Sequence, residues 1–214
     1  MKTATRAAGL CFIACAAVAA ADLAGAQAKR EESLRMAEIV RAMGATDGAK
    51  VGDIGAGSGY YDVALSRAVG ANGRVYAEDI ANYAMKDLHK RVHESHLRNM
   101  EIIHGTADDP KLPAGSLDAA LMVIMYHEIA DHQKMLSHVS AALKPGGRLV
   151  IVDMTPHKTI TRSRADQVKN HVIAPDIVES EVKEAGFEEV SRDDHFIDKP
   201  DEETTRWMIV FKKP

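Results

Sequence analysis

Cysteine is nearly absent from this chain: among its 214 residues only Cys11 and Cys15 carry a thiol. The sequence also lacks a long run of lysine or arginine, and its formal net charge is -4. Nucleic acid is therefore not expected as a partner, because proteins that bind it neutralise phosphates with clustered basic residues. Internal repeats and low-complexity tracts are absent from the sequence as well. With 46% hydrophobic residues, the chain has the size and composition of one domain with a single core.

The first residues have the three-part pattern of a secretory signal peptide. Lys2 and Arg6 precede an apolar stretch over residues 7–21, which is followed by the small residues Ala24-Gly25-Ala26. We predict a signal peptide over residues 1–26, with cleavage after Ala26. A lipoprotein signal with Cys15 as the acylated residue is the alternative form of processing.

Cleavage at this point would leave residues 27–214 as a single exported domain, expected in the periplasm and free of the membrane. A spanning anchor would need ~20 apolar residues, and Asp22 closes the stretch before that length is reached. Both cysteines lie in the part removed. The mature chain is then expected to have no disulfide, no thiolate metal site and no cysteine nucleophile.

Turning to what the sequence contains, the most informative segment is Asp53-Ile54-Gly55-Ala56-Gly57-Ser58-Gly59. Its three glycines tolerate positive φ and let a bound molecule approach the backbone closely. A short apolar run precedes it and a helical pattern follows it, so the pattern predicts a strand, a glycine turn and a helix. The free amides at the helix start suit a polar or anionic group, and Asp53 supplies an acceptor, so we expect a nucleoside-type cofactor. The dinucleotide fingerprint places its third glycine one residue later, where this chain has Tyr60.

Periodicity predicts alternating strands and helices along the rest of the chain, which favours an α/β fold with a doubly wound, mostly parallel sheet. The last two strands have too short a link for a helical crossover and should form an antiparallel hairpin. Including the strand that enters Asp53, seven strands are expected. The predicted helices are 31–43, 60–68, 85–98, 131–143 and 175–185, and the other predicted strands are 74–79, 101–104, 117–125, 148–152, 189–197 and 206–211.

Acidic residues and a histidine follow the carboxyl ends of the predicted strands, where open α/β sheets bind their ligands. Asp79 ends the second strand about 20 residues beyond the glycines, the position from which a carboxylate reaches ribose hydroxyls. Its neighbour Glu78 fits a solvated position in the turn. Asp108 follows the third strand and His127 follows the central strand.

Several motifs, in order and spacing, resemble class I S-adenosylmethionine-dependent methyltransferases over nearly the whole mature chain. The resemblance rests on the glycine turn, on Ser116-Leu117-Asp118 and on Leu143-Lys144-Pro145-Gly146-Gly147-Arg148-Leu149. It implies a Rossmann-like methyltransferase fold, S-adenosylmethionine as cofactor and a small-molecule acceptor. It also implies a set of cofactor-binding residues: Asp53, Gly55, Ala56, Gly57 and Gly59 at the methionine portion, and Asp79 at the ribose.

One position departs from the family pattern. The family commonly has an acidic residue directly after the glycine that matches Gly105, near the adenine amino group, and this chain has Thr106 there. Asp108 or Asp109 is expected to take over that contact.

His127 is the candidate catalytic residue, because an imidazole with a pKa of about 6.5 accepts a proton near neutral pH. The alternative is that His127 orients the following loop through hydrogen bonds. Glu128 either orients the imidazole or faces solvent. No metal is expected, since the helical trio His89, His93 and His96 fits a solvated face better than a metal site.

Two other functions stay open at this point. The chain would be a non-catalytic S-adenosylmethionine-binding protein if the cofactor pocket supports no turnover. A nicotinamide-dependent oxidoreductase is the second alternative, and the glycine spacing disfavours it.

Overall fold

The computed structural model describes residues 34–157, 163–198 and 202–214. The predicted signal peptide lies outside these residues, so its cleavage after Ala26 stays a prediction. Residues 38–214 form one compact unit that holds the sheet, and residues 1–37 belong to a second unit. None of the helices in the described residues has the length and apolar character needed to cross a membrane.

Helices and strands alternate as the sequence predicts. The helices are α2 (Met36–Met43), α3 (Tyr60–Val69), α4 (Asn82–Glu94), η1 (Tyr126–Glu128, a 3-10 turn), α5 (His132–Ala142), α6 (Arg164–Lys169) and α7 (Pro175–Glu184). The strands are β1 (Lys50–Ile54), β2 (Arg74–Asp79), β3 (Met100–His104), β4 (Leu117–Val123), β5 (Leu143–Pro156), β6 (Glu188–Ile197) and β7 (Thr204–Lys212).

The seven strands form one sheet in the order β3-β2-β1-β4-β5-β7-β6. Strands β1 to β5 pair in parallel, whereas β7 runs antiparallel to both β5 and β6. The predicted fold, a mostly parallel seven-stranded sheet with a C-terminal antiparallel hairpin, is confirmed. The strand order reverses beside β1, and in open α/β sheets this switch point is where ligands bind.

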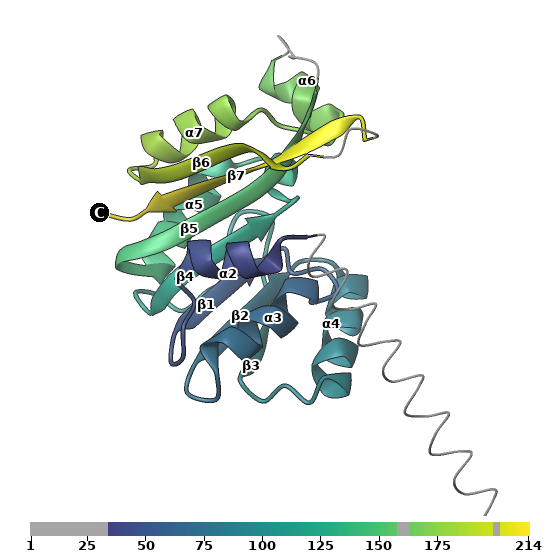
Figure 1. Cartoon of the computed structure of the whole chain (residues 1–214), viewed down its shortest axis with the longest axis vertical. Coiled ribbons are helices and arrows are strands. Elements are labelled where there is room, and N and C mark those ends of the chain that lie inside the picture. The colour runs from purple at the N-terminus through teal and green to yellow at the C-terminus, as the bar shows by residue number, and fades with distance from the viewer. Residues whose placement is uncertain (1–33, 158–162, 199–201) are drawn as a thin grey trace, which may run out of the picture. The chain divides into compact units, whose positions relative to one another are not determined.

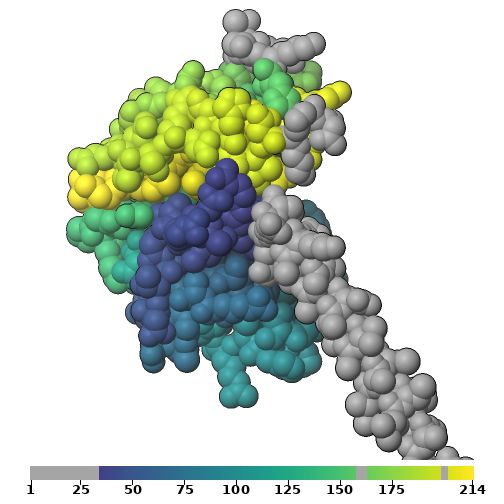
Figure 2. Space-filling view, in the orientation of Figure 1, coloured from purple at the N-terminus to yellow at the C-terminus, as the bar shows by residue number. Residues whose placement is uncertain are grey.

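Helices cover both faces of the sheet because the strands alternate apolar residues between them. In β5, Leu149 and Ile151 pack with α5 and α7, whereas Val150 and Val152 pack with α2 and α3. Helix α4 lies on the α2 and α3 face, where Leu88 packs near β2. Figure 1 shows these two layers on the sheet, and Figure 2 shows side chains of α2 and α3 closing over one face. Full burial of such a side chain contributes roughly 1.5–3 kcal/mol, so the sheet is stabilised from both sides.

The central strand is shorter than predicted. The pattern over residues 117–125 predicted a strand to Met125, but β4 ends at Val123 because Ile124 has a φ of 52°. This left-handed conformation interrupts the extended backbone and costs a β-branched residue roughly 1–2 kcal/mol. The chain turns here, so that η1 crosses the carboxyl end of the sheet. Backbone strain of this kind tends to occur at functional sites.

Candidate active site

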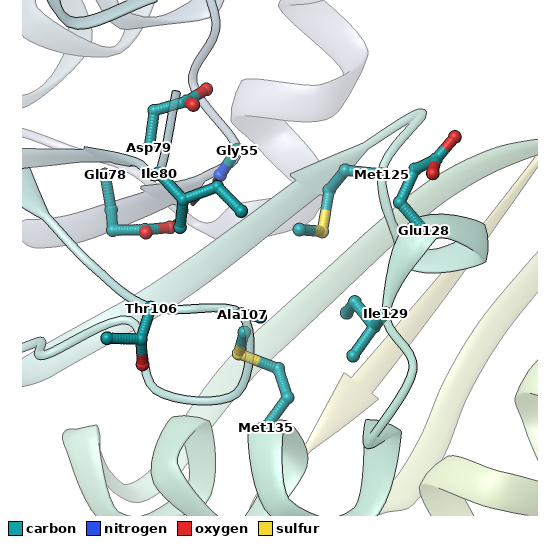
Figure 3. A pocket seen from close by; sticks show the side chains of 10 residues that line it. All are labelled: Gly55, Glu78, Asp79, Ile80, Thr106, Ala107, Met125, Glu128, Ile129 and Met135. Atoms are coloured by element: carbon teal, nitrogen blue, oxygen red, sulfur yellow. Dashed lines mark hydrogen bonds between the residues drawn. The ribbon is translucent and has the colours of Figure 1, made fainter. Parts of the chain in front are cut away.

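A pocket lies at the switch point, outside the carboxyl ends of β1, β2, β3 and β4. It has about 410 Å³ of empty space, counting the part open to solvent. Figure 3 shows the side chains around it. Its lining residues are Gly55, Glu78, Asp79, Ile80, Thr106, Ala107, Met125, Glu128, Ile129 and Met135.

The glycine turn has the backbone that the sequence predicts. Gly55, Gly57 and Gly59 have φ values of 74°, 57° and 74°, in the left-handed region that favours glycine. A Cβ on Gly59 would lie 2.6 Å from the Leu88 side chain, so this glycine lets α3 and α4 pack closely. A Cβ on Gly57 would meet nothing within 4 Å. The turn is thus closed toward the core and open at its centre.

Asp79 is fixed by the turn and lines the pocket. Its Oδ2 accepts a hydrogen bond from the Gly57 amide at 2.9 Å, and its Oδ1 accepts one from the Ala81 amide at 2.8 Å. A carboxylate has about four acceptor sites, so two bonds leave capacity for ligand hydroxyls. The geometry is compatible with the ribose contact predicted for Asp79, which stays a prediction.

Glu78 is not the solvated residue that its place in the turn indicated; that interpretation is wrong. Its side chain is 2% exposed, and its Oε2 accepts a hydrogen bond from the Gly55 amide at 3.3 Å. Burial raises the pKa of Glu78 to about 8, against the effect of the Gly55 hydrogen bond, and the charge of Asp79 raises it further. Oε1 of Glu78 has no hydrogen-bond partner and belongs to a residue that lines the pocket.

Two further buried carboxyl groups lie behind the turn. Asp53 is 2% exposed and Asp62 is fully buried, and Oδ2 of Asp53 and both oxygens of Asp62 lack a hydrogen-bond partner. Burial is the main cause that raises the pKa of both groups, to about 7 for Asp62, and mutual repulsion with Asp62 and Glu78 raises the pKa of Asp53 further. Asp53 does not line the pocket, so the cofactor contact predicted for it would be indirect, made through the backbone of the glycine turn.

In the turn after β3, the carboxylates of Asp108 and Asp109 accept hydrogen bonds from other residues of the protein. Oδ1 of Asp108 accepts a hydrogen bond from the Thr106 hydroxyl at 3.0 Å, and its Oδ2 pairs with Lys134. Oδ1 of Asp109 accepts one from the Lys111 amide at 2.8 Å. Thr106 and Ala107 line the pocket, but neither aspartate does. The adenine contact assigned to Asp108 or Asp109 stays a prediction, and the structure does not bring either carboxylate into the pocket.

His127 is held in η1 by a buried carboxylate. Its Nδ1 lies 2.8 Å from Oδ1 of Asp153 in β5, and its amide donates to Oδ2 of the same residue at 3.1 Å. Asp153 is fully buried and His127 is 3% exposed. Burial lowers the pKa of His127, but Asp153 and Glu128 outweigh this effect and the net shift is upward. The imidazole is thus oriented by Asp153, a residue that the sequence analysis did not single out.

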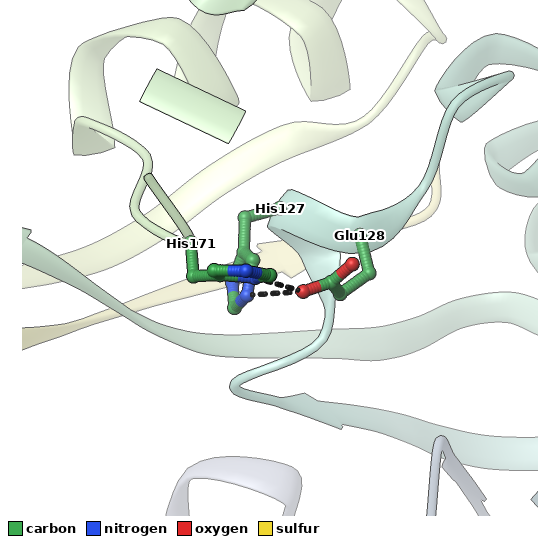
Figure 4. Close-up of side chains that lie close together, drawn as sticks. All are labelled: His127, Glu128 and His171. Atoms are coloured by element: carbon green, nitrogen blue, oxygen red, sulfur yellow. Dashed lines mark hydrogen bonds and ion pairs between the residues drawn. The ribbon is translucent and has the colours of Figure 1, made fainter. Parts of the chain in front are cut away.

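Glu128 does not merely face solvent. Its Oε1 lies 3.1 Å from Nε2 of His127 and 2.6 Å from Nδ1 of His171, as Figure 4 shows. Sequence reasoning missed His171, because it lies 43 residues away in a loop with no motif around it. Glu128 also lines the pocket, so this group adjoins it. The trio His89, His93 and His96 is exposed, as expected.

Comparison with known proteins places the chain in a family. The model of the ubiE/COQ5 methyltransferase family matches residues 29–209. The chain belongs to this family. Because these are S-adenosylmethionine-dependent methyltransferases, the cofactor class expected from the motifs is confirmed at the level of the family, and the nicotinamide alternative loses its support.

Individual similarities are more distant. A demethylmenaquinone methyltransferase of Listeria monocytogenes serovar 1/2a is 28% identical over 116 residues, which cover 54% of this chain and 49% of that protein. The chain thus spans about half the length of the curated relatives it matches. A SAM-dependent methyltransferase from Aquifex aeolicus has a TM-score of 0.70 at 21% identity, covering 84% of this chain and 89% of that chain. The [4+2]-cyclase SpnF has a TM-score of 0.73 at 13% identity, covering 85% of this chain and 81% of that chain. These structures share the fold, and they differ in reaction.

The residues present fit S-adenosylmethionine. Its ammonium and sulfonium groups are cations, and Glu78, which lines the pocket, carries a buried carboxyl oxygen without a hydrogen-bond partner. Its ribose hydroxyls suit Asp79, and its close approach to backbone suits the open position at Gly57. The set of donors and acceptors therefore matches the charge and the hydroxyl groups of this cofactor.

Proposed function

We propose that this chain is an S-adenosylmethionine-dependent methyltransferase that acts on a small-molecule acceptor. The observation that supports it most is the left-handed glycine turn at the switch point, tied to Asp79 by the Gly57 amide at 2.9 Å and open to the pocket. When bound, the cofactor supplies an activated methyl group on sulfur.

The cofactor side of the pocket is built by β1 and β2. The Gly55–Gly59 turn and Asp79 orient the bound cofactor, and the unpartnered Oε1 of Glu78 provides an acceptor near a cationic group. Orientation is the main requirement, because in-line displacement needs the acceptor atom placed behind the methyl carbon.

The acceptor side is apolar, and Glu128, which lines the pocket, connects it to the buried His127. Met125, Ile129 and Met135 line it, which suits a flat apolar acceptor such as a quinone-type ring. Asp153 holds the Nδ1 side of His127, so that Nε2 is the acceptor nitrogen of the neutral imidazole. His127 is the residue that would accept the proton of an acceptor hydroxyl at Nε2, which would free the oxygen to receive the methyl group supplied by the bound cofactor.

Calorimetry of the purified protein with S-adenosylmethionine tests the cofactor half of this proposal. We expect binding, and a loss of at least tenfold in affinity for Asp79→Ala, with the exposed Asp87→Ala on α4 as control. Absence of binding to the unaltered protein would overturn the proposal.

Methylation assays with demethylmenaquinone and a panel of phenolic and quinol acceptors test the catalytic half. We expect transfer to at least one acceptor and its loss in His127→Gln. Cofactor binding without transfer to any acceptor would favour the non-catalytic alternative.

The proposal includes export, with residues 1–26 as a signal peptide. Mass spectrometry of the protein recovered from cell fractions tests it, and we expect a periplasmic protein that begins at Gln27. Full-length protein in the cytosolic fraction would refute export without affecting the proposed chemistry.

A further inference from the structure

Three possible metal ligands converge beside the pocket from two segments of the chain. His127 and Glu128 belong to η1, and His171 lies in the loop between α6 and α7. Nε2 of His127, a carboxylate oxygen of Glu128 and a ring nitrogen of His171 all lie within 4.8 Å of one another. Among the described residues this is the one such group of three His, Cys, Asp or Glu side chains. We infer that it binds a divalent transition metal, with zinc as the best match.

The ligand types support zinc over magnesium or calcium. Two imidazole nitrogens and one carboxylate oxygen form a donor set that zinc uses in sites with an open fourth position. Magnesium and calcium prefer oxygen ligands throughout. Figure 4 shows the contacts of both rings meeting at one carboxylate oxygen of Glu128, so the three possible ligands are already gathered in one place.

Asp153 supports the arrangement by contacting the other ring nitrogen of His127. It lies 2.8 Å from Nδ1 of His127, and because a carboxylate only accepts, Nδ1 carries the hydrogen and Nε2 is turned toward Glu128. Histidine ligands typically donate their other N–H to a carboxylate in this way, which fixes the ring and raises its basicity. Asp153 is itself fixed, since it is fully buried and accepts from the amides of His127 and Met154.

Two of the three distances between donors need only a small adjustment, and the third, between the two ring nitrogens, lies within 4.8 Å. Two donors at ~2.0 Å from a tetrahedral metal are about 3.3 Å apart. Nε2 of His127 is already 3.1 Å from Oε1 of Glu128, and Nδ1 of His171 at 2.6 Å would have to move outward. That movement is easy, because the side chains of His171 and Glu128 are 71% and 56% exposed. The buried ligand, His127, is already in position, and the two exposed ligands, Glu128 and His171, would move toward the ion.

A metal here would face the acceptor side of the pocket, since Glu128 lines it. Its open position would then bind an acceptor oxygen and lower the pKa of that hydroxyl, whose proton would pass to solvent. His127 would act as the proton acceptor only in the metal-free protein. The metal's role rests on the proposed methyl transfer, whereas metal binding itself does not.

The experiment uses untagged protein stripped with a chelator and then titrated with zinc sulfate by calorimetry, with bound metal counted by mass spectrometry. We expect one zinc ion per chain in the unaltered protein and at least tenfold weaker binding in His171→Ala. The matched control is His195→Ala, because His195 is also 70% exposed and its Nδ1 also lies 3.0 Å from a carboxylate, that of Asp198. The control should bind zinc as the unaltered protein does.

A second readout separates ligation from folding and from methyl transfer. Cobalt in place of zinc should show the visible absorption of a tetrahedral site, and Glu128→Gln should weaken it while circular dichroism stays unchanged. No stoichiometric zinc in the unaltered protein, or equal affinity in His171→Ala, would overturn the inference. Cofactor titration of the same samples keeps the outcomes distinct, because zinc binding without cofactor binding would refute only the proposed function.

Discussion

Replacing Glu78 by Gln should remove a large part of the pH dependence of folding stability. Burial raises the pKa of Glu78 from 4.5 to about 8, so the folded state holds this proton more tightly than the unfolded state does. The contribution to the free energy of unfolding is fully present below pH 4.5 and is lost as pH rises through about 8. The whole loss corresponds to about 5 kcal/mol, at 1.36 kcal/mol for each pH unit between the two values.

Urea unfolding at pH 5.5 and pH 8.5 measures this effect. Over that interval the linkage relation assigns to Glu78 a loss of about 3 kcal/mol, and Glu78→Gln should lose that much less than the unaltered protein. The amide can still accept the hydrogen bond from Gly55, which keeps the local geometry. Glu101→Gln on β3 is the control, since Glu101 is exposed. Equal pH dependence in Glu78→Gln and the unaltered protein would refute the reasoning.

Three further outcomes are expected. Gly57→Ala should weaken S-adenosylmethionine binding at least tenfold by calorimetry. Gly48→Ala is the control, because Gly48 has a φ of 84° and equally open surroundings; both variants should lose roughly 1–2 kcal/mol of folding stability, but Gly48→Ala should bind the cofactor normally. Equal binding in both variants would contradict the assigned role. Trp207→Phe should lower the free energy of unfolding by about 1–3 kcal/mol, because it leaves the Ile173 carbonyl without its bond of 2.9 Å, and urea unfolding with a loss under about 0.5 kcal/mol would disagree. Cofactor affinity should rise between pH 6 and 8, since a bound cation favours ionised Glu78, and a Glu78→Gln variant with the same calorimetric pH profile would rule this out.

The glycine turn and the position of Asp79 beside it could be predicted from sequence because their signals are local. The glycine turn needs left-handed backbone at Gly55, Gly57 and Gly59, and only the spacing of glycines is required to see it. Asp79 follows from the strand end one βα unit later. Each of these positions depends on residues close to it in the sequence, so periodicity and residue type were sufficient to predict it.

Glu78 shows where such reasoning stops. Its burial depends on Gly105, since a Cβ there would lie 2.0 Å from Oε1 of Glu78. Glu78 lies in β2 and Gly105 directly follows the neighbouring strand β3, and no spacing rule connects them. The glycine at position 105 was the signal that could have indicated a buried side chain against it.

The acceptor half depends on contacts of still longer range. His127 was found from its place after the central strand, but Asp153 and His171 reach it from 26 and 44 residues away, through the β4–β5 pairing and the loop before α7. The turn that brings η1 to them starts at Ile124, whose left-handed φ is unexpected for a β-branched residue. Because one fold scaffold supports both methyltransferases and a cyclase, the chemistry has to be decided on this side of the pocket, by side chains that tertiary structure alone assembles.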